Sequence, residues 1–325
     1  FQGVLLYMGI KKFLPAALSC AAALTVPLSA CGGGQEEGGL TFTEATALGG
    51  RQFYVASGTV EAEDGVYHIP GSHEGLPVSQ VENITFVGNG TVLILGEGIE
   101  YIESGILGDN RHITSLVLPT TVEEIYSYAF SGTALEYVNF SAGLWNIGQE
   151  AFRGTPLKSV CIPSNVGSVG GMAFYESSIQ SAIVEAQSVG QAAFAFCPYL
   201  VHVSLGDDTI RVYNRAFGSN RSLISVNLND VQEIWHKAFN DCDALERITI
   251  PAAADFVSST AFCGCASLEE IVFEKTSDWF LCKRDENFDY VPVAAADLSD
   301  PAANVELLGG ELEDYVYRRI PGYEI

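Results

Sequence analysis

The sequence is poor in positive charge. Only 16 of the 325 residues are lysine or arginine, against 40 aspartates and glutamates, so the formal net charge is −24. The basic residues do not cluster either, because the only adjacent pairs are Lys11-Lys12, Lys283-Arg284 and Arg318-Arg319. Such a surface repels phosphate backbones and anionic lipid headgroups. We therefore expect no nucleic-acid partner.

Familiar catalytic and metal-binding motifs are also lacking. The five histidines form no H-E-x-x-H pair, and His68 and His73 have no evident third ligand. Acidic clusters such as Glu123-Glu124 lack the glycine-containing loop of alternating ligands that calcium needs. The GEG at residues 96–98 does not match a phosphate-binding loop. We expect no metal, no cofactor and no enzymatic activity.

Charged residues make up only 17% of the chain, whereas hydrophobic residues make up 48%. This composition allows a sizeable core and argues against global disorder. The length fits one large domain or two small ones.

One long apolar run stands near the N-terminus. Lys11 and Lys12 precede FLPAALSCAAALTVPLSA, which ends in small residues before Cys31. This order of basic start, apolar middle and small-residue end is typical of a secretory signal, so we predict a signal peptide over residues 1–30. Met8 is the plausible start of translation, with residues 1–7 upstream of it.

The end of that run carries a second signal. Leu28-Ser29-Ala30-Cys31 resembles the bacterial lipobox, which implies diacylglyceryl on the sulfur of Cys31. The alternatives are an ordinary signal peptide with an incidental cysteine, or a short membrane anchor. The GGGQEEGG that follows is typical of a flexible tether. We predict a lipidated cysteine and tether over residues 31–40, and an extracytoplasmic, surface-exposed protein anchored by lipid to the bacterial envelope.

An internal repeat organises the rest of the chain. Alanine-phenylalanine pairs recur every 20 to 23 residues, and a β-branched residue always stands five positions before the phenylalanine. Two weaker copies, Val81…Phe86 and Ile102…Leu107, come earlier. A unit of this length cannot bury its apolar side alone, so neighbouring units must stack into a solenoid. The phenylalanines are Phe130, Phe152, Phe174, Phe194, Phe217, Phe239 and Phe262.

Each phenylalanine is followed by an L-x-x-V-x-I block, which predicts a short strand with alternate side chains pointing inward. Proline ends the block at Pro119, Pro163 and Pro251. Three residues after each phenylalanine stands a small residue, which we expect to bond backbone carbonyls of its own or the adjacent coil. These residues are Asn89, Asn110, Thr133, Thr155, Ser177, Cys197, Asn220, Cys242 and Cys265.

The unit I-x-x-x-A-F-x-x-[CTN]-x-L-x-x-V-x-[IL]-P resembles the BspA-like leucine-rich repeats of bacterial surface proteins. VYHIPGSHEGLPVSQVENITF resembles the first coil of that family, and DWFLCKRDENFDYV with DPAANVELLGGELEDYVYRRI resembles its terminal cap. The resemblance implies a mainly β fold with short helical turns, a solenoid of about nine coils of 20–24 residues. The implied domains are an N-terminal cap at 41–65, the solenoid at 66–275 and a C-terminal cap at 276–325. The units around Val184–Val189, Val81 and Ile102 depart from the pattern.

The outward positions of the predicted strands form two columns along the solenoid. They are rich in hydroxyl and amide groups and mildly apolar, as in surfaces that contact proteins or glycans. The alternative is a polar sheet face without a partner. We predict that this face binds, through Tyr137, Asn139, Ser159, Cys161, Ser181, Ile183, His202, Ser204, Ser225, Asn227, Arg247 and Thr249.

Within these columns His202 lies between Ser181 and Ser225, which allows either a nucleophile and base or simple hydrogen bonding. Nothing in the sequence supplies an orienting carboxylate or an oxyanion hole, so we expect hydrogen bonding. Arg247 beside Glu270 predicts a cross-strand ion pair. Cys161 is expected to point outward, and we expect no catalytic role for it because no histidine lies in its column on the neighbouring coils.

The cysteines of the small-residue column, Cys197, Cys242 and Cys265, are expected to be packed thiols. A disulfide between Cys242 and Cys265 remains open, as do pairings among Cys263, Cys265 and Cys282, because export permits them. Cys263-x-Cys265 alone is weak evidence for zinc.

The function that the family resemblance implies is adhesin-like recognition of a host, matrix or other cell-surface protein, without catalysis. The alternatives are a structural or scaffolding protein of the envelope and a glycan-binding module.

Overall fold

The computed structural model describes residues 39–47, 50–107, 110–310 and 314–321. The predicted signal peptide, Cys31 and most of the tether lie outside these residues. No helix among the described residues is long and apolar enough to cross a membrane.

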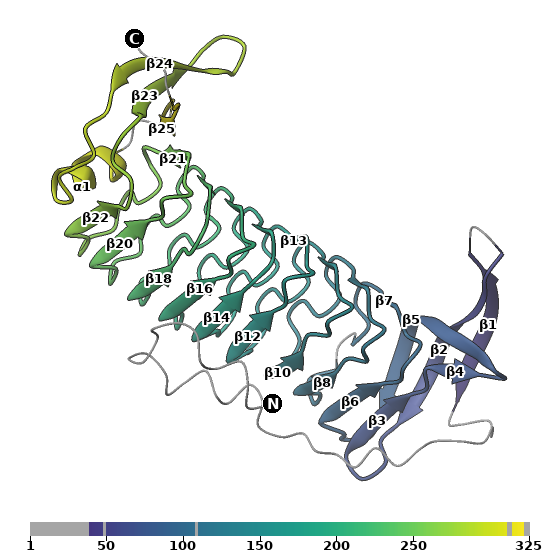
Figure 1. Ribbon diagram of the computed structural model, residues 1–325. Helices are drawn as coiled ribbons and strands as arrows, with labels where there is room; N and C mark the ends of the chain where they lie inside the picture. The colour runs from purple at the N-terminus through teal and green to yellow at the C-terminus, as the bar shows by residue number, and fades with distance from the viewer. Residues whose placement is uncertain (1–38, 48–49, 108–109, 311–313, 322–325) are drawn as a thin grey trace, which may run out of the picture. The chain divides into compact units, whose positions relative to one another are not determined.

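The chain winds into coils whose strands form two series, and Figure 1 shows the coils stacked side by side. The front strands are the L-x-x-V-x-I blocks of the sequence, and they pair in parallel within three successive sheets. They are β3 (Val66–Ile69), β6 (Val92–Leu95), β8 (Ser115–Val117), β10 (Tyr137–Asn139), β12 (Ser159–Ile162), β14 (Ser181–Val184), β16 (His202–Leu205), β18 (Ser225–Asn227), β20 (Arg247–Ile250) and β22 (Glu270–Phe273). The predicted solenoid fold is confirmed.

The back strands form a second sheet, which the sequence analysis did not predict. Each contains the β-branched residue that precedes the Ala-Phe pair, and most are only two residues long, too short for an alternation signal. The back strands pair in one sheet of 15 strands with the strands at both ends of the stack. They are β5 (Leu76–Val87), β7 (Tyr101–Ile102), β9 (Glu124–Ile125), β11 (Asn146–Ile147), β13 (Ser168–Val169), β15 (Ser188–Val189), β17 (Arg211–Val212), β19 (Glu233–Ile234) and β21 (Phe256–Ser258).

Between a back strand and the next front strand, the Ala-Phe segment turns the chain through consecutive tight turns. In one coil, Arg153 N donates to Glu150 O and Thr155 N donates to Phe152 O, both at 3.3 Å. The backbone is left-handed at Glu150 (φ 53°) and Gly154 (φ 66°). Phe152 N also donates to Ala173 O of the next coil at 2.7 Å, so the turns join neighbouring coils as the strands do.

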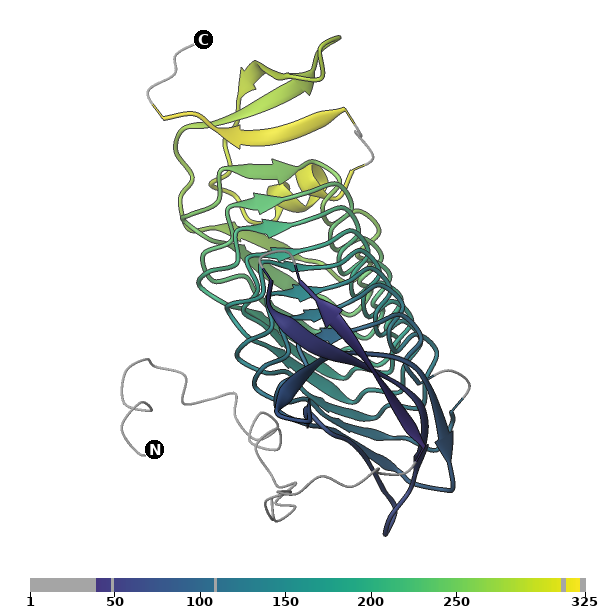
Figure 2. The ribbon, with the colours of Figure 1, turned by 90° about the vertical axis from the view of Figure 1, so that its right-hand side faces the viewer.

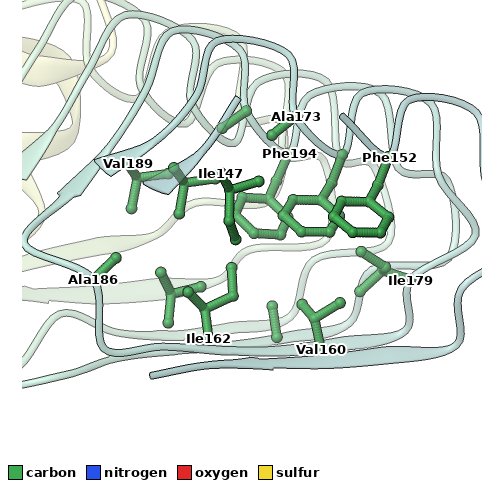
Figure 3. Close-up of a cluster of buried hydrophobic side chains, with 14 of the residues drawn as sticks. Ile147, Phe152, Val160, Ile162, Ala173, Ile179, Ala186, Val189 and Phe194 are labelled. Atoms are coloured by element: carbon green, nitrogen blue, oxygen red, sulfur yellow. The ribbon is translucent and has the colours of Figure 1, made fainter. Parts of the chain in front are cut away.

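The phenylalanines of these turns stack on one another through the centre of the solenoid. Phe152 and Phe174 are 5.2 Å apart between ring centroids and 3° from parallel, and Phe174 and Phe194 are 4.9 Å apart. Figure 3 shows Phe152 and Phe194 in this stack, with Val160 and Ile162 of the front strand facing them. The stack runs from Phe130 to Phe262, and every ring in it is buried.

Six of the nine small residues, from Thr133 onward and except Ser177, bond backbone carbonyls as predicted, whereas the side chain of Asn110 accepts from His112 N and Ile113 N instead. Thr133 and Thr155 each donate a hydroxyl to the phenylalanine carbonyl of their own coil at 2.8 Å. The thiols of Cys197, Cys242 and Cys265 instead reach the phenylalanine carbonyl of the preceding coil, at 3.2, 3.3 and 3.0 Å. The column therefore ties coils together as well as closing each one.

Antiparallel strands adjoin both ends of the stack. At one end β1 (Leu40–Thr46) pairs antiparallel with β2 (Gln52–Glu61), and β2 pairs in parallel with β5. The short β4 (Ser72–His73) pairs antiparallel with β5. At the other end β25 (Tyr315–Arg319) pairs with β21, and Figure 2 shows it alongside β23 (Trp279–Arg284). β24 (Tyr290–Ala295) completes that edge, and α1 (Ala303–Leu308) packs beside β22. The cap and solenoid boundaries stay predictions.

Candidate binding face

The front strands carry the predicted binding residues in two continuous columns. Parallel pairing aligns Ser159 with Ser181, Ser181 with His202, and His202 with Ser225. Side chains alternate along a strand, so Val160 and Ile162 point into the core and are buried, whereas Ser159 and Cys161 point outward. The same alternation holds in the other front strands.

All twelve predicted residues lie at outward positions of the front strands β10 to β20, which stand side by side in Figure 1. We call these twelve residues the front face. Tyr137 is the most protruding aromatic side chain among them, at 57% exposed. The exposed members are Tyr137, Asn139, Cys161, His202, Asn227, Arg247 and Thr249, and the half-buried ones are Ser159, Ser181, Ile183, Ser204 and Ser225.

The front face is almost free of charge. The outward positions run from Val92 in β6 to Asn227 in β18 without one aspartate, glutamate, lysine or arginine. Charge appears only at the C-terminal end, where Arg247 and Glu270 face each other across β20 and β22. Their side chains are 3.0 Å apart, which confirms the predicted ion pair. Both are well exposed, so the pair adds little stability.

The side chain of Asn139 bonds the backbone of the preceding coil, a role that the sequence did not predict. Its side-chain oxygen accepts a hydrogen bond from Leu118 N at 2.9 Å, and its amide nitrogen donates to Leu118 O at 3.1 Å. These two bonds stand where the strand ladder of β8 and β10 ends, and the next front sheet begins at β12. Both the oxygen and the nitrogen of the Asn139 side-chain amide are therefore already hydrogen-bonded within the fold, which reduces its capacity to bond a ligand.

His202 forms a hydrogen bond with the hydroxyl of Ser225, with Nδ1 and Oγ 2.7 Å apart. The partner of this nitrogen is thus a hydroxyl and not the carboxylate that orients the histidine of a catalytic triad. The geometry matches the hydrogen bonding expected on a polar sheet face.

Two hollows lie away from the front face. One, of about 580 Å³, is lined by Ile84, Phe86, Leu107, Arg111 and His112 among others. The other, of about 200 Å³, lies between the first coils and β2, and its lining includes Arg51, Phe53, Glu100, Tyr101 and Tyr126. Neither includes His202 or Cys161.

The buried cysteines are packed thiols. Burial raises the pKa of the Cys197 thiol to about 11. Cys242 and Cys265 lie on successive coils, and a hydrogen bond between their thiols raises the pKa of Cys242 and lowers that of Cys265. The protonated thiol is thus favoured at Cys197 and Cys242, which suits a role as hydrogen-bond donor rather than nucleophile.

The sequence analysis missed a group of large apolar side chains that are exposed away from the front face. Tyr128 is 46% exposed, Phe196 50% and Tyr199 59%, and all three lie on the turns around Ala-Phe. Trp145, 50% exposed, precedes β11. The repeat alignment contained the signal for Phe196, because it stands where other coils have Gly132 and Gly154.

Comparison with known proteins gives a family and a fold. A leucine-rich repeat protein from Bacteroides ovatus is similar in structure, with a TM-score of 0.51 and 18% identity over 72% of this chain and 87% of that one. A leucine rich repeat protein from T. pallidum aligns with a TM-score of 0.42 and 17% identity over 70% of this chain and 87% of that one. No curated protein sequence matches the chain.

The sequence profile described as "BspA type Leucine rich repeat region" matches residues 85–187 and 182–280, with six copies. The matched ranges run from β5 to the start of β23 and together exceed half of the 325 residues. The chain belongs to the BspA-type leucine-rich-repeat family.

Proposed function

We propose that this chain is a lipid-anchored protein of the bacterial cell surface that recognises another protein through the front face, in the manner of an adhesin. One observation carries the proposal. A chain with a net charge of −24 keeps the outward positions of its front strands from β6 to β18 free of aspartate, glutamate, lysine and arginine. Depletion of charge is the compositional mark of the core of a protein interface.

The family supports recognition rather than catalysis. Leucine-rich-repeat solenoids typically serve as binding scaffolds, because stacked units create an extended surface whose side chains vary while the core repeats. Here the repeated core consists of the stacked phenylalanines and the inward strand residues, and the varied positions are those of the front face. Tyr137 and Arg247 are of the residue types that carry most binding energy at protein interfaces.

The location rests on the N-terminal sequence. Basic residues, an apolar run and Leu28-Ser29-Ala30-Cys31 together match a lipoprotein signal. Two or more acyl chains anchor a protein stably, and the glycine-rich tether would hold the solenoid away from the bilayer.

The experiment compares the unmodified chain with a triple variant that carries Tyr137→Ala, His202→Ala and Arg247→Ala. A partner is first captured with the purified chain and identified, and its affinity is then measured for both proteins. We expect the triple variant to bind at least about tenfold more weakly, since buried aromatic and arginine contacts dominate interfaces. All three side chains are exposed, so the far-ultraviolet circular dichroism spectrum and Tm should stay the same.

The matched control is Trp145→Ala with Arg221→Ala, which also removes an exposed aromatic and an exposed arginine but leaves the front strands unchanged. It should bind the partner as the unmodified chain does. Equal binding by the triple variant would rule out the front face. Capture of a glycan, with the same dependence on Tyr137, would support the glycan-binding alternative instead.

A further inference from the structure

A strip of aromatic and charged side chains crosses the turns of four successive coils, away from the front face. We call Tyr128, Glu150, Arg153, Tyr175 and Phe196 the aromatic strip. Tyr128 donates its hydroxyl to Glu150 at 3.2 Å, and Arg153 donates to the other oxygen of Glu150 at 2.8 Å. The guanidinium of Arg153 lies over the ring of Tyr175 at 5.1 Å, and the rings of Tyr175 and Phe196 are 5.3 Å apart. Each member thus contacts the next.

Both ends of the aromatic strip have a left-handed backbone, which recurs two residues before and two residues after the repeated phenylalanine in most coils. Tyr128 (φ 61°) and Phe196 (φ 57°) are in the left-handed region, which is unfavourable for bulky side chains. Neither recovers that cost by burial, because the two side chains are 46% and 50% exposed. At the position of Phe196 two earlier coils carry Gly132 and Gly154, which adopt this conformation without strain. The turn itself therefore does not require an aromatic ring at Phe196, whose contact within the strip is with Tyr175.

The charged centre of the aromatic strip is held in place before any partner arrives. Arg153 is bonded to Glu150, lies 3.6 Å from Glu176 and is stacked on Tyr175. A side chain that is already ordered loses less entropy on binding. Tyrosine, phenylalanine and arginine are also enriched at protein interfaces, and tyrosine and arginine dominate their hot spots.

The charge and shape of the aromatic strip argue against a small ligand and against a second copy of the chain as its partner. None of the five residues lines either of the two hollows described above, so a small ligand would find no enclosure there. A second copy of this chain would bring another net charge of −24 and be repelled. Glu176, 53% exposed, stands one coil before Phe196 at the same place in the turn. Glu150 and Glu176 together outnumber the single guanidinium of Arg153, so the strip with Glu176 is acidic on balance.

We propose that the aromatic strip is a second protein-binding surface, whose partner offers an apolar pocket for Phe196 with lysine or arginine at its rim. The strip lies on the turns and the front face on the strands, so separate substitutions test the two surfaces. A negative result for the aromatic strip would not affect the proposal for the front face, and the reverse also holds.

The test uses the full chain and a displayed library of random peptides. Peptides are selected on the unmodified chain and counter-selected on the double variant Tyr128→Gly with Phe196→Gly. We expect the retained peptides to combine large apolar residues with lysine or arginine. Synthetic versions should bind the double variant at least about tenfold more weakly, as expected for loss of interface hot spots, and should weaken on Glu176→Lys and in high salt.

The Tm of the double variant distinguishes a role of the two aromatic rings in binding from a role in stabilising the fold. Glycine relieves the left-handed strain at both positions, which offsets the loss of the hydrogen bond from Tyr128 to Glu150. The double variant should therefore not unfold at a lower Tm than the unmodified chain, while it loses the peptides. The matched control is Ser219→Gly, which makes the same backbone change in the next coil (φ 60°) without removing an aromatic ring. It should keep the peptides.

Four results would overturn the proposal. Three are recovery of no peptide that distinguishes the double variant, recovery of acidic or uncharged peptides, and a lower Tm for the double variant. Sedimentation that reveals a dimer dependent on Phe196 would assign the strip to a second copy of the chain and would also overturn it.

Discussion

The side-chain amide of Asn220 donates to the carbonyl oxygen of Phe194 in the preceding coil at 2.9 Å. It also donates to Phe217 O in its own coil at 2.9 Å, and its side-chain oxygen accepts from Cys197 N at 2.8 Å. One fully buried residue therefore serves three backbone groups in two coils.

The substitution Asn220→Ala should be strongly destabilising. It leaves three buried backbone groups without their partner, and each such group costs on the order of 1–3 kcal/mol. We expect the free energy of unfolding to fall by about 3 kcal/mol or more, measured by urea denaturation. The control is Ser222→Ala, which removes an exposed hydrogen bond to Pro198 O and should cost less than about 1 kcal/mol. A loss for Asn220→Ala no larger than the control would contradict the role assigned to the amide.

The alanine before each phenylalanine should be required by packing. Ala151 is fully buried, and its carbonyl accepts the bond from Phe130 N at 2.8 Å, so the two coils are close at this point. We expect Ala151→Leu to lower the free energy of unfolding by about 2 kcal/mol through overpacking. Ala151→Gly is the control for side-chain size, because it tests loss of the methyl group instead. A leucine variant as stable as the unmodified chain would refute the packing argument.

The stability of the fold should fall in alkaline solution, in part through Cys197. Burial raises the pKa of its thiol from 9.0 to about 11, so the folded state retains a proton that the unfolded state releases. The contribution of this thiol is complete below pH 9, and it is lost as the pH rises from about 9 to about 11. The loss is on the order of 2–3 kcal/mol.

Urea denaturation between these pH values measures the effect. Cys197→Ser keeps a hydrogen-bonding group and does not titrate in this range, so its stability should decline less steeply than that of the unmodified chain. Parallel curves for the two proteins would show that Cys197 does not contribute.

Lipid anchoring predicts that Cys31 is required for retention at the membrane. We expect Cys31→Ala to abolish the shift in mass on acylation and to move the protein from the membrane fraction to the soluble one. Cys20→Ala lies inside the same apolar run and should change neither. If processing and membrane fractionation of Cys31→Ala are unaltered, the proposal that Cys31 carries a lipid anchor is contradicted.

Much of the coil could be predicted from the sequence because the repeat aligns equivalent positions. The buried phenylalanines, the inward strand residues and the outward columns follow from one period of about 22 residues, read seven times. The hydrogen-bonding role of Thr155 and Asn220 also follows, since a small donor recurs where carbonyls must be paired. The ion pair of Arg247 and Glu270 follows from their alignment on adjacent coils.

The back sheet could not be predicted in this way. Strands such as β11 (Asn146–Ile147) are too short to show an alternation, and they exist because parallel pairing with β9 and β13 satisfies their backbone groups. The bonds from Asn139 to Leu118 could not be predicted either, because they depend on where one front sheet ends, at β10, and the next begins, at β12.

The sequence by itself determined the period of the coil and which side of each unit is buried, because a short unit with a large apolar residue at each fixed position has to stack. Only the tertiary structure decided how side chains on different coils meet. Tyr175 follows the repeated phenylalanine of its coil by one residue, whereas Phe196, on the next coil, follows its own by two. Their contact depends on the left-handed backbone at Phe196 and on the direction of each side chain, which no periodicity encodes.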